Sequence, residues 1–344
     1  MIMDKILKHR FLQSTKQVAA VLVALLVADA FTACQRDGDG IYKPDKKLSK
    51  IFIEKRDGWG LEWVSERELT WEWDGNQLKS ITCNAAGTLE FTFTFEYQNR
   101  RVKTIVCTDD EGWNPITSYY HFHYDGKLLS YIEGFQDTGN EELPQRPCAK
   151  YTFSHNDRQQ ISEIVFEDYG MASKSSGDPL GQILPLILPG IPLADAENIF
   201  QTLEGNSSPK SFKKSVITLT YDGENVKEYR MEDQYYEYYY AYQYTNYQNP
   251  LYRLFSCNYT NYYWPFTSGY SRNLPSVCVG YRNDKYANCT SYNYRFEYNY
   301  QLDRNDFVLS SHQLGLYERY TITYGDTIPT VDTIETYYRY EYVN

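Results

Sequence analysis

The chain has 344 residues, and its 34 lysine and arginine residues against 45 aspartate and glutamate residues give a net charge of −11. With a pI near 5.1 and a mean hydropathy of −0.62, it is neither a basic nucleic-acid binder nor a multi-span membrane protein. Its 36 tyrosine residues are the exceptional feature of the composition. Because tyrosine favours strands and combines an apolar body with a polar tip, this composition predicts an all-β protein.

The N-terminal segment has the layout of a secretory signal. Basic residues precede an apolar run, Val18 to Ala30, which is too short to span a membrane comfortably. The run ends in Phe31-Thr32-Ala33-Cys34, which resembles the lipobox of bacterial lipoproteins, with Phe31 where leucine is commoner. The resemblance implies that residues 1–33 are a lipoprotein signal peptide and that Cys34 is lipidated, so we expect a membrane anchor there.

The polar stretch after Cys34 predicts a lipidated tether over residues 34–50. It carries Asp37 and Asp39, and acidic residues so placed resemble the surface-export signal of Bacteroidetes lipoproteins. We therefore expect an outer-membrane lipoprotein on the cell surface, with the periplasmic face of that membrane as the alternative.

Residues 51–344 are predicted to form a single β-repeat domain. Each repeat has two strands of alternating apolar and polar residues around a short turn, often Asp-Gly, which is typical of a tight hairpin. Two degenerate copies follow five clear ones, so we predict a serial antiparallel meander of about fourteen strands. The clear copies are Leu69–Cys83, Phe93–Cys107, Tyr120–Gly134, Tyr151–Val165 and Ile217–Met231; the degenerate ones lie near Tyr238–Phe255 and Tyr294–Gln313.

A meander of this length is not expected to remain flat, because open twisted sheets rarely exceed about ten strands. Its aromatic face must also be covered. We expect the sheet to curl into a barrel-like or half-pipe shape with that face inward. A transmembrane barrel is not expected, because such barrels turn an apolar face outward, whereas Glu72, Glu96 and His123 share the other face here.

The repeat pattern stops over residues 168–210, where we predict a short helical, proline-rich insertion. Its apolar run Ile183–Leu193 contains three prolines, which exclude a long helix or a membrane span. The insertion is either a plug or lid over the aromatic face, or an exposed contact for a partner or for lipid.

The cysteines do not predict a disulfide framework or a zinc site, because they are sparse and lack Cys-x-x-Cys spacing. Cys83 and Cys107 lie at equivalent ends of alternate strands, about 10 Å apart and beyond disulfide reach, so we predict two core thiols. Cys278 and Cys289 are close enough in sequence to pair.

No nucleophile elbow, zinc-protease motif or phosphate-binding loop is found, and we predict a protein that is not an enzyme and has no cofactor. His121 and His123 share the polar face of one strand, with Glu96 as a candidate third metal ligand. Their outward register is more typical of solvated strand histidines. His155 takes the inward register and is predicted to lie in the core.

Exposed aromatic rings are the candidate ligand-binding groups, because they can stack on the apolar faces of sugar rings. In the tyrosine-dense segment, alternation places Tyr235 and Tyr239 on the face opposite to Tyr236 and its even-numbered neighbours. Cross-strand aromatic pairs also stabilise sheets, which is the structural alternative for these rings. The candidates are Trp59, Trp113 and Trp264, which lie outside the repeats, together with Tyr235 and Tyr239.

The lipobox and the Tyr-Asp-Gly-x-x-Val/Leu-Lys-x-Ile units together resemble a Bacteroidetes family of β-repeat lipoproteins of unknown function, over Ile51–Asn344. The units are distantly similar to tyrosine–aspartate repeats of the Rhs type. The resemblance implies a fold and no activity. We predict non-catalytic binding of a polysaccharide or an envelope protein, with a purely structural or assembly role, or an enzyme with an unidentified site, as the alternatives.

Overall fold

The computed structural model describes residues 41–57, 64–109, 116–139, 144–169, 213–232, 236–252, 271–285, 290–323 and 326–343. Contacts divide the chain into two units, 1–36 and 37–344, and the described residues all belong to the second.

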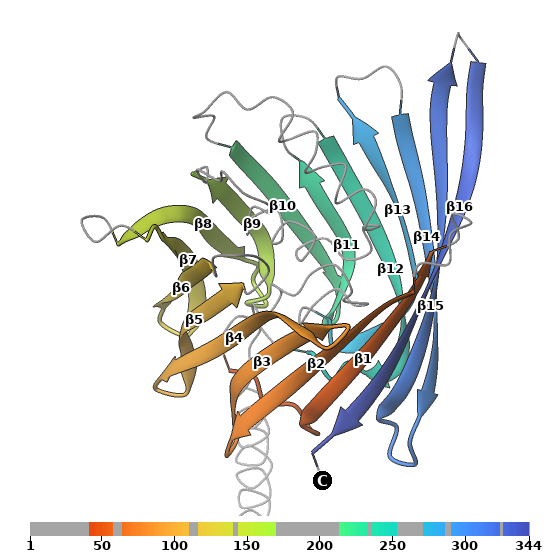
Figure 1. The fold of residues 1–344 in the computed structure, drawn as a ribbon. Helices are drawn as coiled ribbons and strands as arrows, with labels where there is room; N and C mark the ends of the chain where they lie inside the picture. Colours follow the sequence, from red (N-terminus) through yellow and green to blue (C-terminus); the bar gives the residue numbers. More distant parts are fainter. Residues whose placement is uncertain are drawn as a thin grey trace, which may run out of the picture. The chain divides into compact units, whose positions relative to one another are not determined.

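The second unit is a closed barrel in which each strand pairs antiparallel with its neighbours in the sequence. Figure 1 shows the strands following one another round the barrel, with the red β1 alongside the blue C-terminal strands. The all-β antiparallel meander that curls into a barrel-like shape is thus confirmed. The pairing of β1 with β16 closes the barrel, a point that the sequence left open between a barrel and a half-pipe. The strands are β1 (Leu48–Asp57), β2 (Val64–Asp74), β3 (Gln77–Ala85), β4 (Thr88–Gln98), β5 (Arg101–Asp109), β6 (Ile116–Asp125), β7 (Leu128–Asp137), β8 (Gln145–His155), β9 (Ile161–Asp168), β10 (Lys213–Asp222), β11 (Asn225–Glu232), β12 (Tyr236–Gln248), β13 (Asn273–Asp284), β14 (Thr290–Leu302), β15 (Val308–Thr323) and β16 (Asp326–Tyr342).

The strand number differs from the predicted fourteen, because β1 and β16 pair with each other and add one more two-stranded unit. These are the first and last strands in the sequence of the domain. No turn joins them, so the repeat pattern does not detect the pair. The degenerate copy at Tyr238–Phe255 was also wrong as a continuous hairpin. Its second strand, β13, begins only at Asn273. The predicted insertion at 168–210 lies almost entirely outside the described residues.

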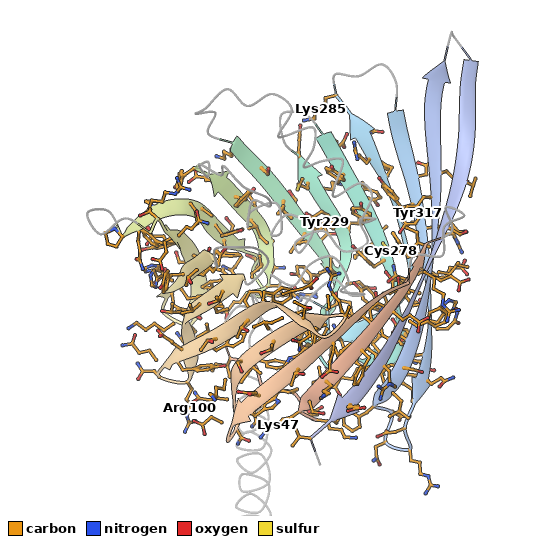
Figure 2. The ribbon with its side chains drawn as sticks, viewed as in Figure 1. Lys47, Arg100, Tyr229, Cys278, Lys285 and Tyr317 are labelled. Carbon is orange, nitrogen blue, oxygen red and sulfur yellow. The ribbon has the colours of Figure 1, made fainter. Side chains whose placement is uncertain are left out.

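Short hairpin turns gather at one end of the barrel, which we call the turn end. There Gly75, Gly126 and Gly223 have φ values of 53°, 58° and 61°, and this left-handed conformation is one that glycine adopts without strain. Figure 2 shows Lys47 and Arg100 at this end and Lys285 at the opposite end, which we call the far end.

The inward face of the barrel carries one continuous apolar core to which every strand contributes. Tyrosine rings fill much of it: Tyr238 and Tyr240 are fully buried, and Tyr294 stacks on Tyr240 with ring centroids 6.0 Å apart. Gly280 faces the same core, where a Cβ atom would lie 2.4 Å from a ring carbon of Tyr240. The tyrosine-rich sequence therefore packs because small residues stand opposite large rings.

At the turn end, an inward aromatic side chain near the end of one strand donates a hydrogen bond to a backbone carbonyl near the start of the preceding strand. We call each such bond an aromatic clasp, and its distances run from 2.7 to 2.9 Å. Clasps satisfy carbonyl groups that would otherwise be buried without a donor. They are Trp73 to Leu48, Tyr97 to Leu78, Tyr124 to Val102, Tyr221 to Ile161, Tyr244 to Val226, Tyr300 to Pro275 and Tyr342 to Val308.

On β8 the clasp position holds His155 instead. Its Nε2 atom is buried and has no hydrogen-bond partner among the described residues. Burial lowers the pKa of this imidazole, because the charged form would be desolvated. The neutral, half-buried His155 agrees with its predicted place on the inward face.

The outward face carries charged and polar side chains, many of them in ion pairs such as Lys50–Glu68 and Arg295–Glu297. Within the described ranges, no helix has the length and apolarity that crossing a membrane requires. Cys83 is buried and Cys107 is half-buried, and both are free thiols, as predicted. Cys278 is also a buried free thiol. Cys289, its possible partner in the sequence, lies outside the described residues.

Candidate functional site

Most of the residues singled out in the sequence lie outside the described part of the chain. These are the lipidation candidate Cys34 and the ring candidates Trp59, Trp113, Trp264 and Tyr235. Their roles therefore stay predictions.

Tyr239 is described, and it lies half-buried on the outward face of β12, as the alternation predicts. Its ring stacks on that of Tyr281, its direct partner on β13, with centroids 5.3 Å apart. From the other side, the guanidinium of Arg230 lies 5.1 Å from the Tyr239 centroid. Because cross-strand neighbours flank this ring, the contacts favour the structural role that was the alternative for the tyrosine block.

The two histidines of β6 do not assemble a metal site. His121 Nδ1 lies 3.3 Å from the hydroxyl of Thr104, whereas His123 Nε2 lies 3.1 Å from Glu133 and its ring stacks on Tyr131. Among the described residues, no group of three or more histidine, cysteine or acidic side chains is placed to hold a metal ion. Burial is the main cause that lowers the pKa of His121, and the charge of His123 lowers it further.

A hollow of about 640 Å³ lies where the two ends of the domain meet, across β14, β15, β16 and β1. Two rows of outward side chains line it, each row running from strand to strand through directly paired residues. We call this feature the seam trough. Its first wall is Asn299, His312, Tyr337 and Glu54, and its second wall is Gln301, Ser310, Arg339 and Phe52.

The trough has a simple origin in strand geometry. The walls are two residues apart along each strand, about 7 Å, and the intervening residues point their side chains into the core. Those intervening residues, such as Tyr338 and Ile53, are buried and leave the sheet itself as the floor. Because four strands spaced about 4.8 Å apart contribute, each wall is about 14 Å long.

The first wall is held by stacking. The His312 ring lies against Tyr337 with centroids 4.5 Å apart and an interplanar angle of 16°. The guanidinium of Arg56, from the strand on the other side, lies 5.0 Å from the Tyr337 centroid. The Tyr337 hydroxyl donates to Glu335 at 2.5 Å, so this ring is fixed both by its faces and by its tip.

The second wall is held by one cation–π contact and one hydrogen bond. Arg339 lies over Phe52, with the guanidinium carbon 3.8 Å from the ring centroid. The Ser310 hydroxyl donates to the amide oxygen of Gln301 at 3.0 Å. This bond leaves the amide nitrogen of Gln301 as a donor, since a primary amide carries both functions.

These contacts leave a preorganised set of polar groups above a narrow floor. The amides of Asn299 and Gln301 are exposed and offer both donors and acceptors. Glu54 and Arg339 each hold an ion pair, with Arg56 and Glu341 respectively. Arg67 of β2, which also lines the hollow, pairs with Glu90, so each of these charges is balanced. A few fixed polar groups between aromatic side chains are typical of a small-molecule site, and amides beside rings suit a polyhydroxylated ligand.

Sequence reasoning missed the trough. Phe52 and Glu54 come from the first strand of the barrel, and Tyr337 and Arg339 come from the last. The available signal was the outward alternation of these strands, but their pairing across the closed barrel is not visible in any local pattern.

No protein-family model and no curated protein matches the chain. Among solved structures, a porin-like protein from Bacteroides uniformis ATCC 8492 matches with a TM-score of 0.41 and 15% identity, over 86% of this chain and 98% of that one. A porin-like protein from Bacteroides vulgatus ATCC 8482 matches with a TM-score of 0.30 and 13% identity, over 87% and 99%.

Proposed function

We propose that this protein is a lipid-anchored barrel of the cell envelope that binds an oligosaccharide in the seam trough without catalysing a reaction. The lipobox ending at Cys34 supports the anchor and the location. The trough supports the binding role, and it is the single observation on which the ligand class depends.

The chemistry of the walls favours a saccharide over a strongly charged ligand. The charged side chains that line the hollow, Glu54, Arg67 and Arg339, already have partners of opposite sign. The amides of Asn299 and Gln301 instead offer the paired donor and acceptor that sugar hydroxyl groups require. Since the trough crosses four strands, a short linear oligosaccharide fits it better than a single compact molecule.

The test is affinity gel electrophoresis of the soluble chain that begins at Gln35, in gels containing mucin or plant and bacterial polysaccharides. We expect retention on at least one of them. Replacing Asn299 and Gln301 together with alanine removes two exposed amides, and we expect Kd to rise at least tenfold, the effect of about 1.4 kcal/mol.

Asn293→Ala is the matched control, because Asn293 is also an exposed outward asparagine of β14 but lies outside the trough. Its affinity should equal that of the wild-type chain, and all variants should unfold at the same temperature. Absence of retention on every polymer contradicts the saccharide ligand. If retention is unchanged in the double variant, the saccharide does not bind in the trough and its site lies on another surface.

A further inference from the structure

The residues that precede β1 are strapped across the turn end of the barrel. The buried Tyr42 hydroxyl donates to the carbonyl of Pro250 at 2.7 Å, and its ring stacks on Trp73. Lys47 donates to the carbonyl of Gly75, and its own carbonyl accepts from the amide of Val343. The strap, residues 41–47, is therefore tied to several separate elements at this end.

Lys46 makes the most specific of these ties. Its ammonium lies 3.1 Å from the carboxylate of Asp303, in the β14–β15 turn. It also lies 4.9 Å from the ring centroid of Phe307 and 4.5 Å from that of Tyr342, so two rings and a carboxylate surround it. Hydrogen bonds from the amides of Phe307 and Asn305, together with Lys46, lower the pKa of Asp303 and keep this carboxylate charged.

The strap limits how far the turn end can move from a lipid attached to Cys34. Six residues lie between Cys34 and Ile41, the first described residue, and the seven steps from one to the other span about 25 Å in a fully extended chain. The far end lies about 30 Å from the turn end, the length of strands such as β2 and β3. A tether of this length therefore holds the turn end closer to the lipid than the far end.

We infer that the turn end of the barrel faces the lipid headgroup layer of the membrane that holds Cys34. This inference rests on the lipid anchor of the proposed function. Exposed carboxylates such as Asp74, Asp125 and Asp222 stand at this end beside exposed basic side chains, so the inference depends on the short tether and not on net charge. The basic side chains can contact anionic headgroups. They are Lys43, Arg100, Lys127, Arg158 and Arg304. Lys47 and Arg100 are seen together at this end in Figure 2.

The orientation has a consequence for the seam trough. Gln301 lies two residues before Asp303, and Phe52 lies four residues after Leu48, the first residue of β1. The second wall of the trough is therefore about 7–14 Å from the turn end. Its ligand is then a saccharide displayed close to the membrane, such as a glycolipid headgroup, rather than a large polymer in solution.

The test places one fluorophore at either end of strand β3. The labelling sites are introduced by Asn76→Cys and Thr88→Cys. Asn76 lies in the turn before β3, Thr88 follows the turn after β3, and both residues are exposed. The acylated full-length protein, with Cys107, Cys257 and Cys289 changed to serine, is placed in phospholipid vesicles that carry a headgroup quencher. We expect severalfold stronger quenching at position 76 than at position 88.

Equal quenching at the two positions, or stronger quenching at position 88, overturns the orientation. The double variant Tyr42→Ala, Lys46→Met loosens the strap and should reduce the difference, while its unfolding is followed separately to confirm a folded barrel. If the purified protein carries no acyl chain, mass spectrometry shows that the anchor itself is absent, and the inference fails with it.

A second arm separates the orientation from the saccharide site. A short oligosaccharide should bind the anchored and the lipid-free forms equally, whereas a polymer of high mass should bind the lipid-free form better. Equal binding of the polymer to both forms contradicts a trough close to the membrane. If neither form binds any saccharide, the proposed ligand is wrong, and the fluorophore pair still decides the orientation.

Discussion

At the turn end of the barrel, neutral aromatic groups bond to backbone carbonyls, whereas towards the far end Arg67 of β2 reaches across β3 to Glu90 of β4. The Arg67–Glu90 pair is nearly buried, with Nε to Oε2 at 2.5 Å and Nη2 to Oε1 at 2.7 Å, and Cys83 also donates to Glu90. The turn end thus repeats a modest hydrogen bond around the barrel, whereas the far end holds a nearly buried ion pair. The two ends should respond to different perturbations.

The largest expected effect is alkaline unfolding. Burial raises the pKa of Tyr242, Tyr298, Tyr338 and Tyr340, which lie just inside the clasps. The folded barrel keeps these protons, whereas the unfolded chain loses them near pH 10, so stability is complete below that pH and falls as the pH rises further. Four such groups reduce the free energy of unfolding by roughly 5 kcal/mol per pH unit.

Phenolate absorbance and circular dichroism, followed together in a pH titration, check this expectation. Exposed tyrosines should ionise first, without loss of structure. The buried tyrosines should ionise together, in the same step in which the barrel unfolds. Gradual ionisation of every tyrosine while the strand signal persists would show that the core is open to hydroxide.

The Arg67–Glu90 pair should give the largest effect of a single substitution. Glu90→Leu leaves a guanidinium largely buried without its carboxylate, and we expect a loss of about 3–5 kcal/mol in the free energy of unfolding. Urea denaturation measures it. The paired variant Arg67→Met, Glu90→Leu should recover most of the loss, and a double variant as unstable as Glu90→Leu would mean that packing rather than charge is responsible.

A clasp should matter less. Tyr97→Phe keeps the ring but removes the donor to the Leu78 carbonyl, and we expect a loss of about 1–2 kcal/mol. Tyr247→Phe is the control, because Tyr247 is 37% exposed on the same sheet. Equal denaturation midpoints for the two variants would show that the clasps do not contribute to stability.

The smallest expected effect is a gain. His155→Tyr introduces a phenol at the one clasp position that lacks it, and we expect about 1 kcal/mol of added stability at neutral pH. Thermal unfolding in parallel with wild type measures the change. A destabilised variant would mean that β7 and β8 do not present a carbonyl where the other strand pairs do.

The sequence predicts the parts of this fold that are local. Alternation such as Phe93, Phe95 and Tyr97 identifies the strands and their inward face, and Asp-Gly pairs identify the turns. It places Tyr239 outward and Cys83 in the core, and both placements are confirmed. These features depend only on neighbours along the chain, which is why a single sequence carries them.

The closure of the barrel and the trough are not local. Phe52 meets Arg339 only because β1 pairs with β16 in one register, and a shift of β1 by one residue would turn Phe52 into the core and away from Arg339. The tryptophans predicted to bind a ligand lie outside the described residues. The trough is therefore a further candidate site and does not replace them. Long-range register is the information that one sequence without its structure does not contain.

The most direct test of saccharide binding in the seam trough is side-chain footprinting of the soluble chain by a photogenerated carbene, with and without a saturating saccharide found in the gel screen. If the saccharide binds in the seam trough, labelling should fall in the peptides that contain Phe52, Asn299, Ser310 and Tyr337. Labelling of His123 and Tyr131, on the outward face of β6 and β7, should be unchanged. Protection elsewhere, with the seam labelled as before, would contradict the claim that the trough binds the ligand.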